Sequence, residues 1–337
     1  MIFDPPKNKE TTEDTAMKHI FIINPAAGAH GATDELRREL SEIGAEYDWE
    51  IYETKAPKDA TEYVKARATA DPRTVLRFYA CGGDGTLNEV VNGAVGFPNV
   101  SVSCYACGSG NDFVKVYGGM ERFRDVRGLL SAEEEAIDLI RVGDKYSINV
   151  TNFGFDTCVA KTMTSVRRKR IIGGKNAYTT GIVKAIFTAM NNKCVVEADG
   201  EVINPKGKML LCTVANGQYV GGSFRCAPKS SNKDGELDVC LFKPISLFRF
   251  LKLLPVYTEG EHLDEKHLAD LAKIMEYRRA KSIRVTAPEG FAYTLDGEIV
   301  EENEFVMEVA PAALRFAVPH QFTSVSHEAP VEEPATV

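Results

Sequence analysis

Gly82-Gly83-Asp84-Gly85-Thr86 is a glycine-rich turn that joins a predicted strand, Val75–Ala80, to a predicted helix. The helix is indicated by apolar residues at i, i+3, i+4 and i+7 within residues 87–94. Glycines in such a turn let backbone N–H groups approach phosphate oxygens closely, and the helix N-terminus adds partial positive charge. A carboxylate in the turn repels phosphate unless a cation lies between them. We therefore expect Asp84 to bind a nucleotide-associated Mg²⁺.

Alternating strands and helices surround this turn. Repeated strand–helix–strand units of this length predict a largely parallel sheet covered by helices. The predicted strands are His19–Ile23, Tyr47–Thr54 and Val100–Tyr105, and the predicted helices begin at an N-cap, Thr33, and at Pro57.

The pattern changes beyond about Asp138, where short β-like runs separated by Asp-Gly turns predominate. Two helical stretches, near residues 175–192 and 246–278, interrupt them. We therefore predict an α/β plus β fold. A Rossmann-like nucleotide-binding domain covers residues 18–140, and an antiparallel β-sandwich substrate domain covers 141–322, with its last strands free to return to the first domain. The polar segments 1–17 and 323–337 are predicted to be disordered tails.

Two further turns lie at the same edge of the predicted sheet. Gly108-Ser109-Gly110-Asn111-Asp112 follows the fourth strand, and Asn24-Pro25-Ala26-Ala27-Gly28 follows the first. Open α/β sheets bind ligands at the carboxyl ends of their strands, so the three turns predict a nucleotide site. The chain has neither G-x-x-x-x-G-K-[ST] nor G-x-G-x-x-G, which argues against P-loop NTPases and ordinary dinucleotide-binding dehydrogenases.

The composition narrows the classes of partner. A net charge of -8 argues against nucleic acid. No apolar run reaches 18 residues and no secretory signal is visible, so we expect a cytoplasmic protein. The eight cysteines stand mostly in strand-like runs and are expected to be buried hydrophobic residues. Cys104 and Cys107 form a C-x-x-C, for which a redox or metal pair is the alternative to core packing.

Four motifs together resemble the bacterial diacylglycerol kinase or lipid kinase family, which includes eukaryotic sphingosine and ceramide kinases and is more distantly related to NAD kinases. The motifs occur in this order between about residues 19 and 318. G-G-D-G-T alone is shared with NAD kinases and is similar in phosphofructokinases, so the combination carries the resemblance. The motifs are Asn24-Pro25-x-x-Gly28, residues 82–90, Gly108–Phe113 and Asp296-Gly297-Glu298.

The resemblance implies ATP and Mg²⁺ in a cleft between the two domains, and a lipid hydroxyl as the phosphate acceptor in the second domain. It also implies a carboxylate network around the catalytic Mg²⁺ from Asp84, Asp112 and Asp138. Family members usually carry Thr where Ser109 stands, and the hydroxyl is kept. The implied nucleotide contacts are Asn24, Pro25, Ala26, Ala27, Gly28, Thr54, Gly82, Gly83, Asp84, Gly85, Thr86, Leu87, Asn88, Glu89, Ser109, Gly110 and Asn111.

The resemblance implies a second, structural Mg²⁺ at a D-G-x-L-D turn. Here that turn is Asp234–Asp238, with Ser231 and Asp234 as ligands and Glu236 binding through its carbonyl. A metal-free Asp-Gly hairpin is the alternative interpretation.

Phosphoryl transfer also needs a group that receives the proton of the acceptor hydroxyl. Asp296-Gly297-Glu298 follows a strand-like run, Phe291–Leu295, and presents two carboxylates on one turn. The resemblance favours this turn as the catalytic base. The residues do not settle whether Asp296 or Glu298 takes the proton, and a plain hairpin turn is the other interpretation.

Two segments suit a lipid acceptor. Residues 157–196 contain no Asp or Glu but eight Lys or Arg, interleaved with apolar residues. This composition suits peripheral docking on an anionic membrane, and a solvated basic face is the alternative. An apolar cluster within residues 247–254 either lines an acyl-chain pocket or belongs to the core.

The sequence therefore predicts an ATP- and Mg²⁺-dependent lipid kinase with a diacylglycerol-like acceptor, giving phosphatidic acid. The alternatives are a soluble NAD kinase-like enzyme and a non-catalytic nucleotide- or membrane-binding module. Residues 108–113 and the basic segment favour a lipid over NAD, and a pure binder has no use for Asp296 and Glu298. The exact lipid and the oligomeric state, a homodimer included, stay open.

Overall fold

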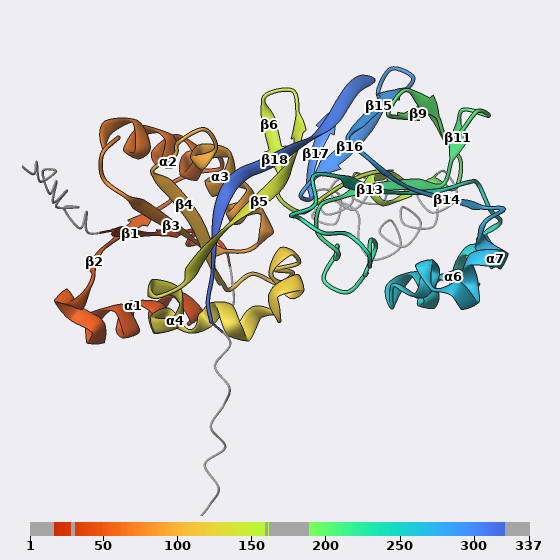
Figure 1. The fold of residues 1–337 in the computed structure, drawn as a ribbon. Helices are drawn as coiled ribbons and strands as arrows, with labels where there is room; N and C mark the ends of the chain where they lie inside the picture. Colours follow the sequence, from red (N-terminus) through yellow and green to blue (C-terminus); the bar gives the residue numbers. More distant parts are fainter. Residues whose placement is uncertain (1–16, 28–30, 159–160, 162–188, 321–337) are drawn as a thin grey trace, which may run out of the picture.

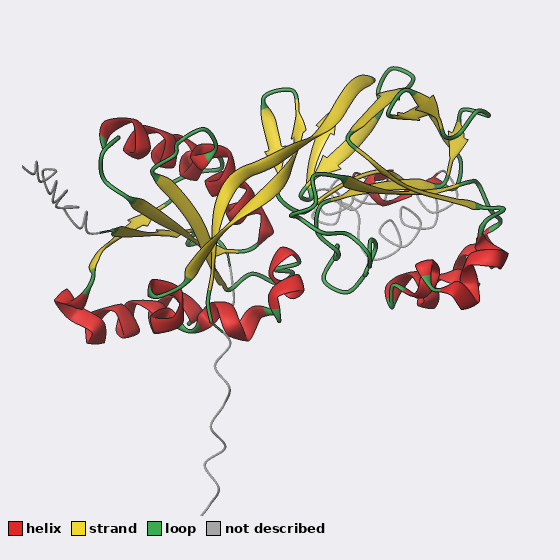
Figure 2. Ribbon diagram, viewed as in Figure 1, coloured by secondary structure: helices red, strands yellow, loops and turns green. Residues whose placement is uncertain are grey.

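Four parallel strands in the order β2-β1-β3-β4 form the first sheet of the chain. The computed structural model describes residues 17–27, 31–158, 161 and 189–320. Helices α2 and α3 cover one face of the sheet, and α1 and α4 cover the other (Figure 2). Every residue of β3 and β4 is therefore buried, which explains their near-continuous apolar sequences. The elements are β1 (Lys18–Ile23), α1 (Ala32–Ile43), η1 (Gly44–Glu46), β2 (Asp48–Glu53), α2 (Asp59–Ala70), β3 (Leu76–Gly82), α3 (Asp84–Ala94), β4 (Val100–Ala106), η2 (Phe113–Tyr117), η3 (Met120–Arg124) and α4 (Val126–Leu130).

Two predicted helix starts are wrong by a few residues. Gly31, with φ 108°, is the N-cap of α1, and Thr33 lies inside the first turn. Pro57 precedes α2, which begins at Asp59 after Lys58 takes a left-handed φ of 72°. In both cases a residue with a left-handed backbone conformation directly precedes the helix. The sequence pattern does not predict this conformation, so it does not predict the first helical residue.

The second half of the chain contains a six-stranded antiparallel sheet in the order β14-β13-β12-β7-β16-β17. It faces the strands β15, β9 and β10 across a core that includes Phe153, Val196 and Ile283. The remaining elements are β5 (Glu133–Val142), β6 (Lys145–Ser147), β7 (Val150–Gly154), β8 (Asn192–Lys193), β9 (Val195–Ala198), β10 (Glu201–Val202), β11 (Lys208–Met209), β12 (Leu211–Ala215), β13 (Leu237–Phe242), α6 (Leu247–Thr258), η4 (Glu261–Leu263), α7 (Glu265–Leu271), β14 (Met275–Ala280), β15 (Ser282–Thr286), β16 (Ala292–Leu295), β17 (Glu298–Glu301) and β18 (Glu304–Val318).

Two long antiparallel strands, β5 and β18, connect the halves (Figure 1). β18 pairs with β15 through residues 304–308 and with β4 at Phe316, so one continuous sheet runs through both domains. Leu314 and Phe316 lie in the first core, whereas Phe305 and Met307 lie in the second. The change of register between Ala310 and Leu314 marks the crossing.

These features confirm the predicted fold class of an α/β domain followed by an antiparallel β domain. The predicted helical stretch 246–278 is wrong at its end, because Met275–Ala280 is strand β14. The stretch 175–192 lies largely outside the described residues. Helices α6 and α7 lie on the outer face of the six-stranded sheet (Figure 1). No helix among the described residues is long and apolar enough to cross a membrane.

Candidate active site

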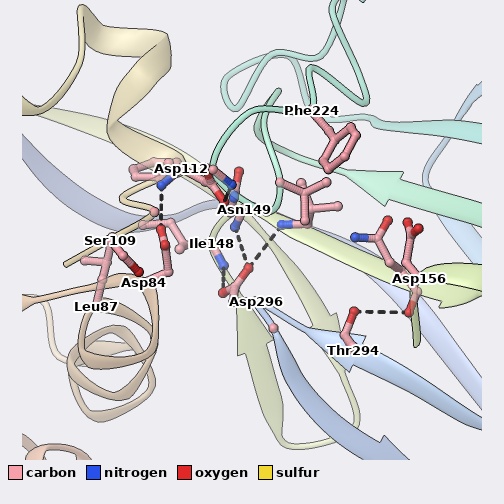
Figure 3. A pocket seen from close by; sticks show the side chains of 18 of the residues that line it. Asp84, Leu87, Ser109, Asp112, Ile148, Asn149, Asp156, Phe224, Thr294 and Asp296 are labelled. Carbon is pink, nitrogen blue, oxygen red and sulfur yellow. Dashed lines mark hydrogen bonds between the residues drawn. The ribbon is translucent and has the colours of Figure 1, made fainter. Parts of the chain in front are cut away.

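A cleft of about 660 Å³ opens between the two domains. One end is formed by the start of α3 and the loop after β4, and the other by β7, α6 and the loop around residue 222. Figure 3 shows Asp84 and Asp112 at the first end, and Phe224 and Asp156 toward the other. The lining residues are Asp84, Leu87, Ser109, Gly110, Asp112, Phe113, Ile148, Asn149, Val150, Asn152, Phe155, Asp156, Val220, Gly221, Gly222, Phe224, Phe250, Leu254, Thr294, Asp296 and Gly297.

The two glycine turns pack directly against each other. A Cβ atom on Gly108 would lie 2.3 Å from the Cα of Gly83, and one on Gly110 would lie 2.6 Å from Asp84 Oδ2. The Gly82 carbonyl also accepts hydrogen bonds from the N–H groups of Cys107 and Gly108. Glycine is required here because any side chain would separate the two turns and the acidic groups they carry.

Asp84 and Asp112 lie side by side at this junction. The N–H of Asp112 donates to Asp84 Oδ1 at 2.7 Å, and the carboxylate of Asp112 pairs with Lys115 at 2.5 Å. Burial, together with the neighbouring carboxylates of Asp112 and Asp296, raises the pKa of Asp84 to about 6. Two neighbouring carboxylates that repel each other are suited to bind a divalent cation between them. Mg²⁺ takes one or two carboxylates and completes its shell with phosphate and water.

The first and second strands bring the other nucleotide candidates to the same edge. The side-chain amide of Asn24 donates to the hydroxyl of Thr86 at 3.1 Å, which ties the first turn to α3. Thr54 follows β2, and its N–H donates to the carbonyl of Ile23. Pro25 and Ala26 are exposed beside them, and Ala27 is half-buried. The remaining residue of that turn, Gly28, lies outside the described residues.

Three further residues that were predicted to contact the nucleotide form hydrogen bonds with other parts of the protein. Asn88 crosses the cleft and donates to Asp296 Oδ2 at 2.7 Å. Glu89 accepts from the N–H of Lys58, and Asn111 donates to the carbonyl of Gly108. These three side chains hold the surrounding loops in place.

Asp296 occupies the turn between β16 and β17 and lines the cleft. Its φ of 47° brings its carboxylate back over the start of β7. There it accepts five hydrogen bonds, three of them from consecutive backbone N–H groups. Burial raises the pKa of Asp296, and the hydrogen bonds to its charged form oppose that rise. The donors are Asn88 Nδ2, Ser147 Oγ and the N–H groups of Ile148, Asn149 and Val150.

The other candidate base, Glu298, does not line the cleft. It is exposed at the start of β17. Asp138 is not among the cleft residues either. Its two oxygens accept hydrogen bonds from the N–H groups of Gly235 and Ala312, at 2.7 and 2.8 Å. Asp138 therefore lies apart from the cleft lining that contains Asp84 and Asp112, and its place in the predicted carboxylate network stays a prediction.

The predicted structural metal turn contains an arginine. The Arg279 guanidinium contacts Asp234 at 2.5 Å and Glu236 at 2.9 Å, so a protein cation already neutralises both carboxylates. Ser231 is half-buried and has no recorded contact with them. No three acidic, histidine or cysteine side chains converge as a metal centre in the part of the chain that the structure describes. The two carboxylates of this turn are thus paired with a protein cation, and Mg²⁺ binding by Ser231, Asp234 and the Glu236 carbonyl stays a prediction.

The sequence analysis missed Asp156, which follows β7 and lies at the opposite end of the cleft from Asp84 (Figure 3). Its carboxylate has no hydrogen-bond or ion-pair partner among the described residues, and burial raises its pKa to about 6. Phe155, Phe224 and Leu254 are its apolar neighbours in the cleft lining. No sequence signal marks it, since one acid after a strand resembles any turn residue.

The other sequence candidates divide between core and surface. Cys104 and Cys107 are buried free thiols, which supports core packing. The basic residues between 162 and 188 lie outside the described residues. In the cluster 247–254, Phe250 and Leu254 line the cleft, whereas Phe248 and Leu251 point to solvent.

Two family models together cover the described fold. Residues 18–142 match the "Diacylglycerol kinase catalytic domain", and residues 149–318 match the "YegS C-terminal NAD kinase beta sandwich-like domain". The diacylglycerol kinase of Bacillus subtilis (strain 168) is 27% identical over 282 residues, covering 82% of this chain and 88% of its own. "Probable lipid kinase YegS" of Salmonella arizonae (strain ATCC BAA-731 / CDC346-86 / RSK2980) is 29% identical, covering 84% and 89%.

Solved structures share the same fold. A diacylglycerol kinase from Bacillus anthracis str. Sterne superposes with a TM-score of 0.68 at 21% identity, and the match covers 89% of this chain and 96% of that one. The likeness extends over both domains, so their arrangement around the cleft belongs to a known architecture.

Proposed function

Because the chain belongs to the lipid kinase family that carries a diacylglycerol kinase catalytic domain, we propose that it transfers the γ-phosphate of Mg²⁺-bound ATP to a lipid hydroxyl. One observation carries this proposal. The interdomain cleft joins an acidic end, with Asp84 and Asp112 on glycine turns, to an apolar end lined by Phe155, Phe224 and Phe250. A kinase for an apolar acceptor needs both environments within one cleft.

The acidic end suits the nucleotide. The α3 N-terminus and the glycine turns offer backbone N–H groups to phosphate oxygens, and Asn24 and Thr86 lie at the adjacent strand end. Asp84 and Asp112 would hold Mg²⁺, which supplies neutralisation of the phosphate charge when bound. Lys115, paired with Asp112, fixes the orientation of that carboxylate.

Asp296 is the candidate base on this proposal, since it lines the cleft and Glu298 does not. The acceptor oxygen forms a bond to the γ-phosphorus, the bond to the β,γ-bridging oxygen breaks, and ADP leaves. The hydroxyl proton passes to the carboxylate of Asp296 as one of its five donors gives way. The same hydrogen bonds hold the β16–β17 turn against the start of β7, and the one from Asn88 links that turn to α3.

The apolar end suits a diacylglycerol-like acceptor, whose phosphorylation gives phosphatidic acid. Acyl chains would lie against Phe250 and Leu254, while the polar head faces the acidic end. Asp156 lies at the apolar end, where it would accept a hydrogen bond only from an acceptor with a donor group beyond the phosphorylated hydroxyl, as monoacylglycerol has and diacylglycerol has not. The lipid partner and a peripheral contact with an anionic membrane follow from this acceptor.

The test is a transfer assay. Purified protein is incubated with labelled ATP, Mg²⁺ and vesicles that each contain one lipid class, with NAD in a parallel reaction. We expect label in a lipid, diacylglycerol first, and none in NAD. Label in NAD would favour the NAD kinase-like alternative, and calorimetry without any ATP binding would leave a membrane-binding module.

A further inference from the structure

Helix α6, Leu247–Thr258, has apolar side chains on two opposite faces but none of its residues is buried. Phe250, Leu253, Leu254 and Tyr257 follow helical spacing and face the protein, where Phe250 packs on Phe155 with ring centroids 4.8 Å apart. A helix with apolar residues on opposite faces is normally buried on both. In α6 only one face packs against the protein, so the apolar residues of the other face have no packing partner among the described residues.

The outward face carries Phe248 and Leu251, three residues apart. Phe248 is 81% exposed and Leu251 is 56% exposed. Among the described residues only one other large hydrophobic side chain, Val202, is comparably exposed, at 41%. Isolated apolar residues at the surface are common, but a large aromatic with an aliphatic neighbour on one helix face indicates a contact surface.

The charges within α6 have one sign, and the exposed Glu259 follows the last residue of the helix. Lys243, Arg249 and Lys252 are the charged residues of 243–258, and the segment has no Asp or Glu although the whole chain carries a net charge of -8. None of the three cations forms an ion pair within the described residues, as is also true of nearly half of the described cations elsewhere. Free cations beside exposed apolar residues match the anionic headgroups and acyl chains of a bilayer surface.

We propose that α6 is a membrane-docking helix that lies in the plane of an anionic bilayer, with Phe248 and Leu251 inserted and Arg249 and Lys252 at the headgroups. This rests on the proposed function, because the opposite face of the helix lines the acceptor end of the cleft through Phe250 and Leu254. A lipid leaving the bilayer at α6 therefore meets the cleft without crossing a polar surface. The partner is a lipid surface, and a second copy of the chain is the competing occupant.

The first experiment measures binding of the full-length protein to phosphatidylcholine vesicles with and without phosphatidylglycerol, in the absence of ATP. The wild type is expected to sediment with the anionic vesicles and to be released by salt. The double variant Phe248→Ala/Leu251→Ala is expected to partition at least about tenfold more weakly, because two inserted side chains are removed. Arg249→Ser/Lys252→Ser is expected to lose the preference for phosphatidylglycerol.

Val202→Ala is the matched control, since it removes an exposed apolar side chain on β10, away from α6. It should bind vesicles like the wild type. Equal vesicle binding by the wild type and the Phe248→Ala/Leu251→Ala variant would overturn the proposal. So would sedimentation velocity showing a wild-type dimer that becomes a monomer in that variant.

Kinase assays separate this inference from the proposed function. With a short-chain acceptor dissolved as monomers, the Phe248→Ala/Leu251→Ala variant should match the wild type, and with vesicle-bound acceptor it should lose activity in proportion to its binding. If the wild type phosphorylates no lipid yet binds vesicles through α6, the proposed function fails and the docking surface stands. If activity on vesicles survives the loss of Phe248 and Leu251, the docking role fails alone.

Discussion

The backbone N–H of Asp112 donates to Asp84 Oδ1 at 2.7 Å. This hydrogen bond holds together two acidic residues that come from different loops, one after β3 and one after β4. Their repulsion is part of why the pKa of Asp84 rises to about 6. The repulsion between the two carboxylates destabilises the cation-free protein. A bound cation neutralises them, so cation binding is favoured by the free energy of the repulsion that it relieves.

Asp84→Asn is therefore expected to increase stability while removing activity. The folded pKa of Asp84, about 6, lies above its ordinary value of 3.8, so its protonated form is favoured by folding. The stability that this group contributes is present below pH 3.8 and is lost as pH rises through about 6. The variant should be more stable than the wild type at pH 8, by about 1–2 kcal/mol, and equal to it near pH 4.

Thermal unfolding at the two pH values, with a kinase assay at pH 8, checks this. Activity should fall at least about a hundredfold, since a ligand of the proposed cation is lost. A variant that is less stable at pH 8 would show that Asp84 is already stabilised as an anion.

Asp296→Asn should lose both activity and stability. An amide NH₂ group would face backbone donors that now bind a carboxylate oxygen, at a cost of about 2–4 kcal/mol. Glu298→Gln is the control from the same turn, and because Glu298 is exposed it should retain wild-type stability and turnover. Denaturant melts and initial rates measure both. Loss of turnover in Glu298→Gln alone would move the base to that residue.

Gly108→Ala is expected to destabilise the chain by about 1–3 kcal/mol, because its Cβ would lie 2.3 Å from the Cα of Gly83. Gly85→Ala has open space around its Cβ and lies inside α3, so it should raise stability by up to about 1 kcal/mol. Differential scanning calorimetry compares them. If Gly85→Ala melts higher yet binds ATP more weakly, close backbone approach to phosphate is supported, and equal destabilisation of both would refute the packing argument.

For an acceptor with a second donor group, such as monoacylglycerol, Asp156→Asn should raise the acceptor KM roughly tenfold while leaving the KM for ATP unchanged, because it removes a charged hydrogen-bond acceptor from the apolar end only. The pKa of Asp156 is raised to about 6 by burial, so acceptor KM in the wild type should fall as pH rises through 6. The variant should lack this pH dependence. Steady-state kinetics at several pH values decide the matter, and an unchanged acceptor KM would exclude the contact.

Removal of divalent metal should leave the melting temperature of the free protein nearly unchanged, because Arg279 already pairs with Asp234 and Glu236. Arg279→Gln should lower stability by about 0.5–1 kcal/mol, a small cost since the pair is partly exposed. Unfolding scans with EDTA and with Mg²⁺ test both statements. A large loss of stability in EDTA for the wild type would support the structural metal site.

The sequence predicted the parts of the fold that depend on local pattern. The strand, turn and helix at residues 76–94 follow from buried apolar spacing and glycine, and the β-like runs Leu237–Phe242 and Ser282–Thr286 coincide with β13 and β15. Pairing across the chain was less predictable. The apolar runs Phe305–Val309 and Leu314–Val318 predict two strands, but both belong to one strand, β18, which pairs with β5 on either side of Ala312.

The candidate site shows the same limit. Asp84 and Asp112 could be placed together because the carboxyl ends of adjacent parallel strands meet. The separation of Asp138 from the cleft lining could not be predicted, since its partners, Gly235 and Ala312, lie 97 and 174 residues away. The sequence does not mark Asp156 as a site residue. Its role is inferred from the lack of a hydrogen-bond or ion-pair partner among the described residues, which is known only once the chain has folded.

The sharing of β5 and β18 between the two cores means that neither lobe is an independent folding unit. A fragment ending before Glu304 would lack the strand that stands between β4 and β15, and would leave the edge of each lobe unpaired. Cleavage of a connection between the two domains should therefore leave the two fragments bound to each other. A change in the width of the cleft would therefore deform the paired strands β5 and β18, whose register is irregular around Ala312, where the N–H of Ala312 donates to Asp138.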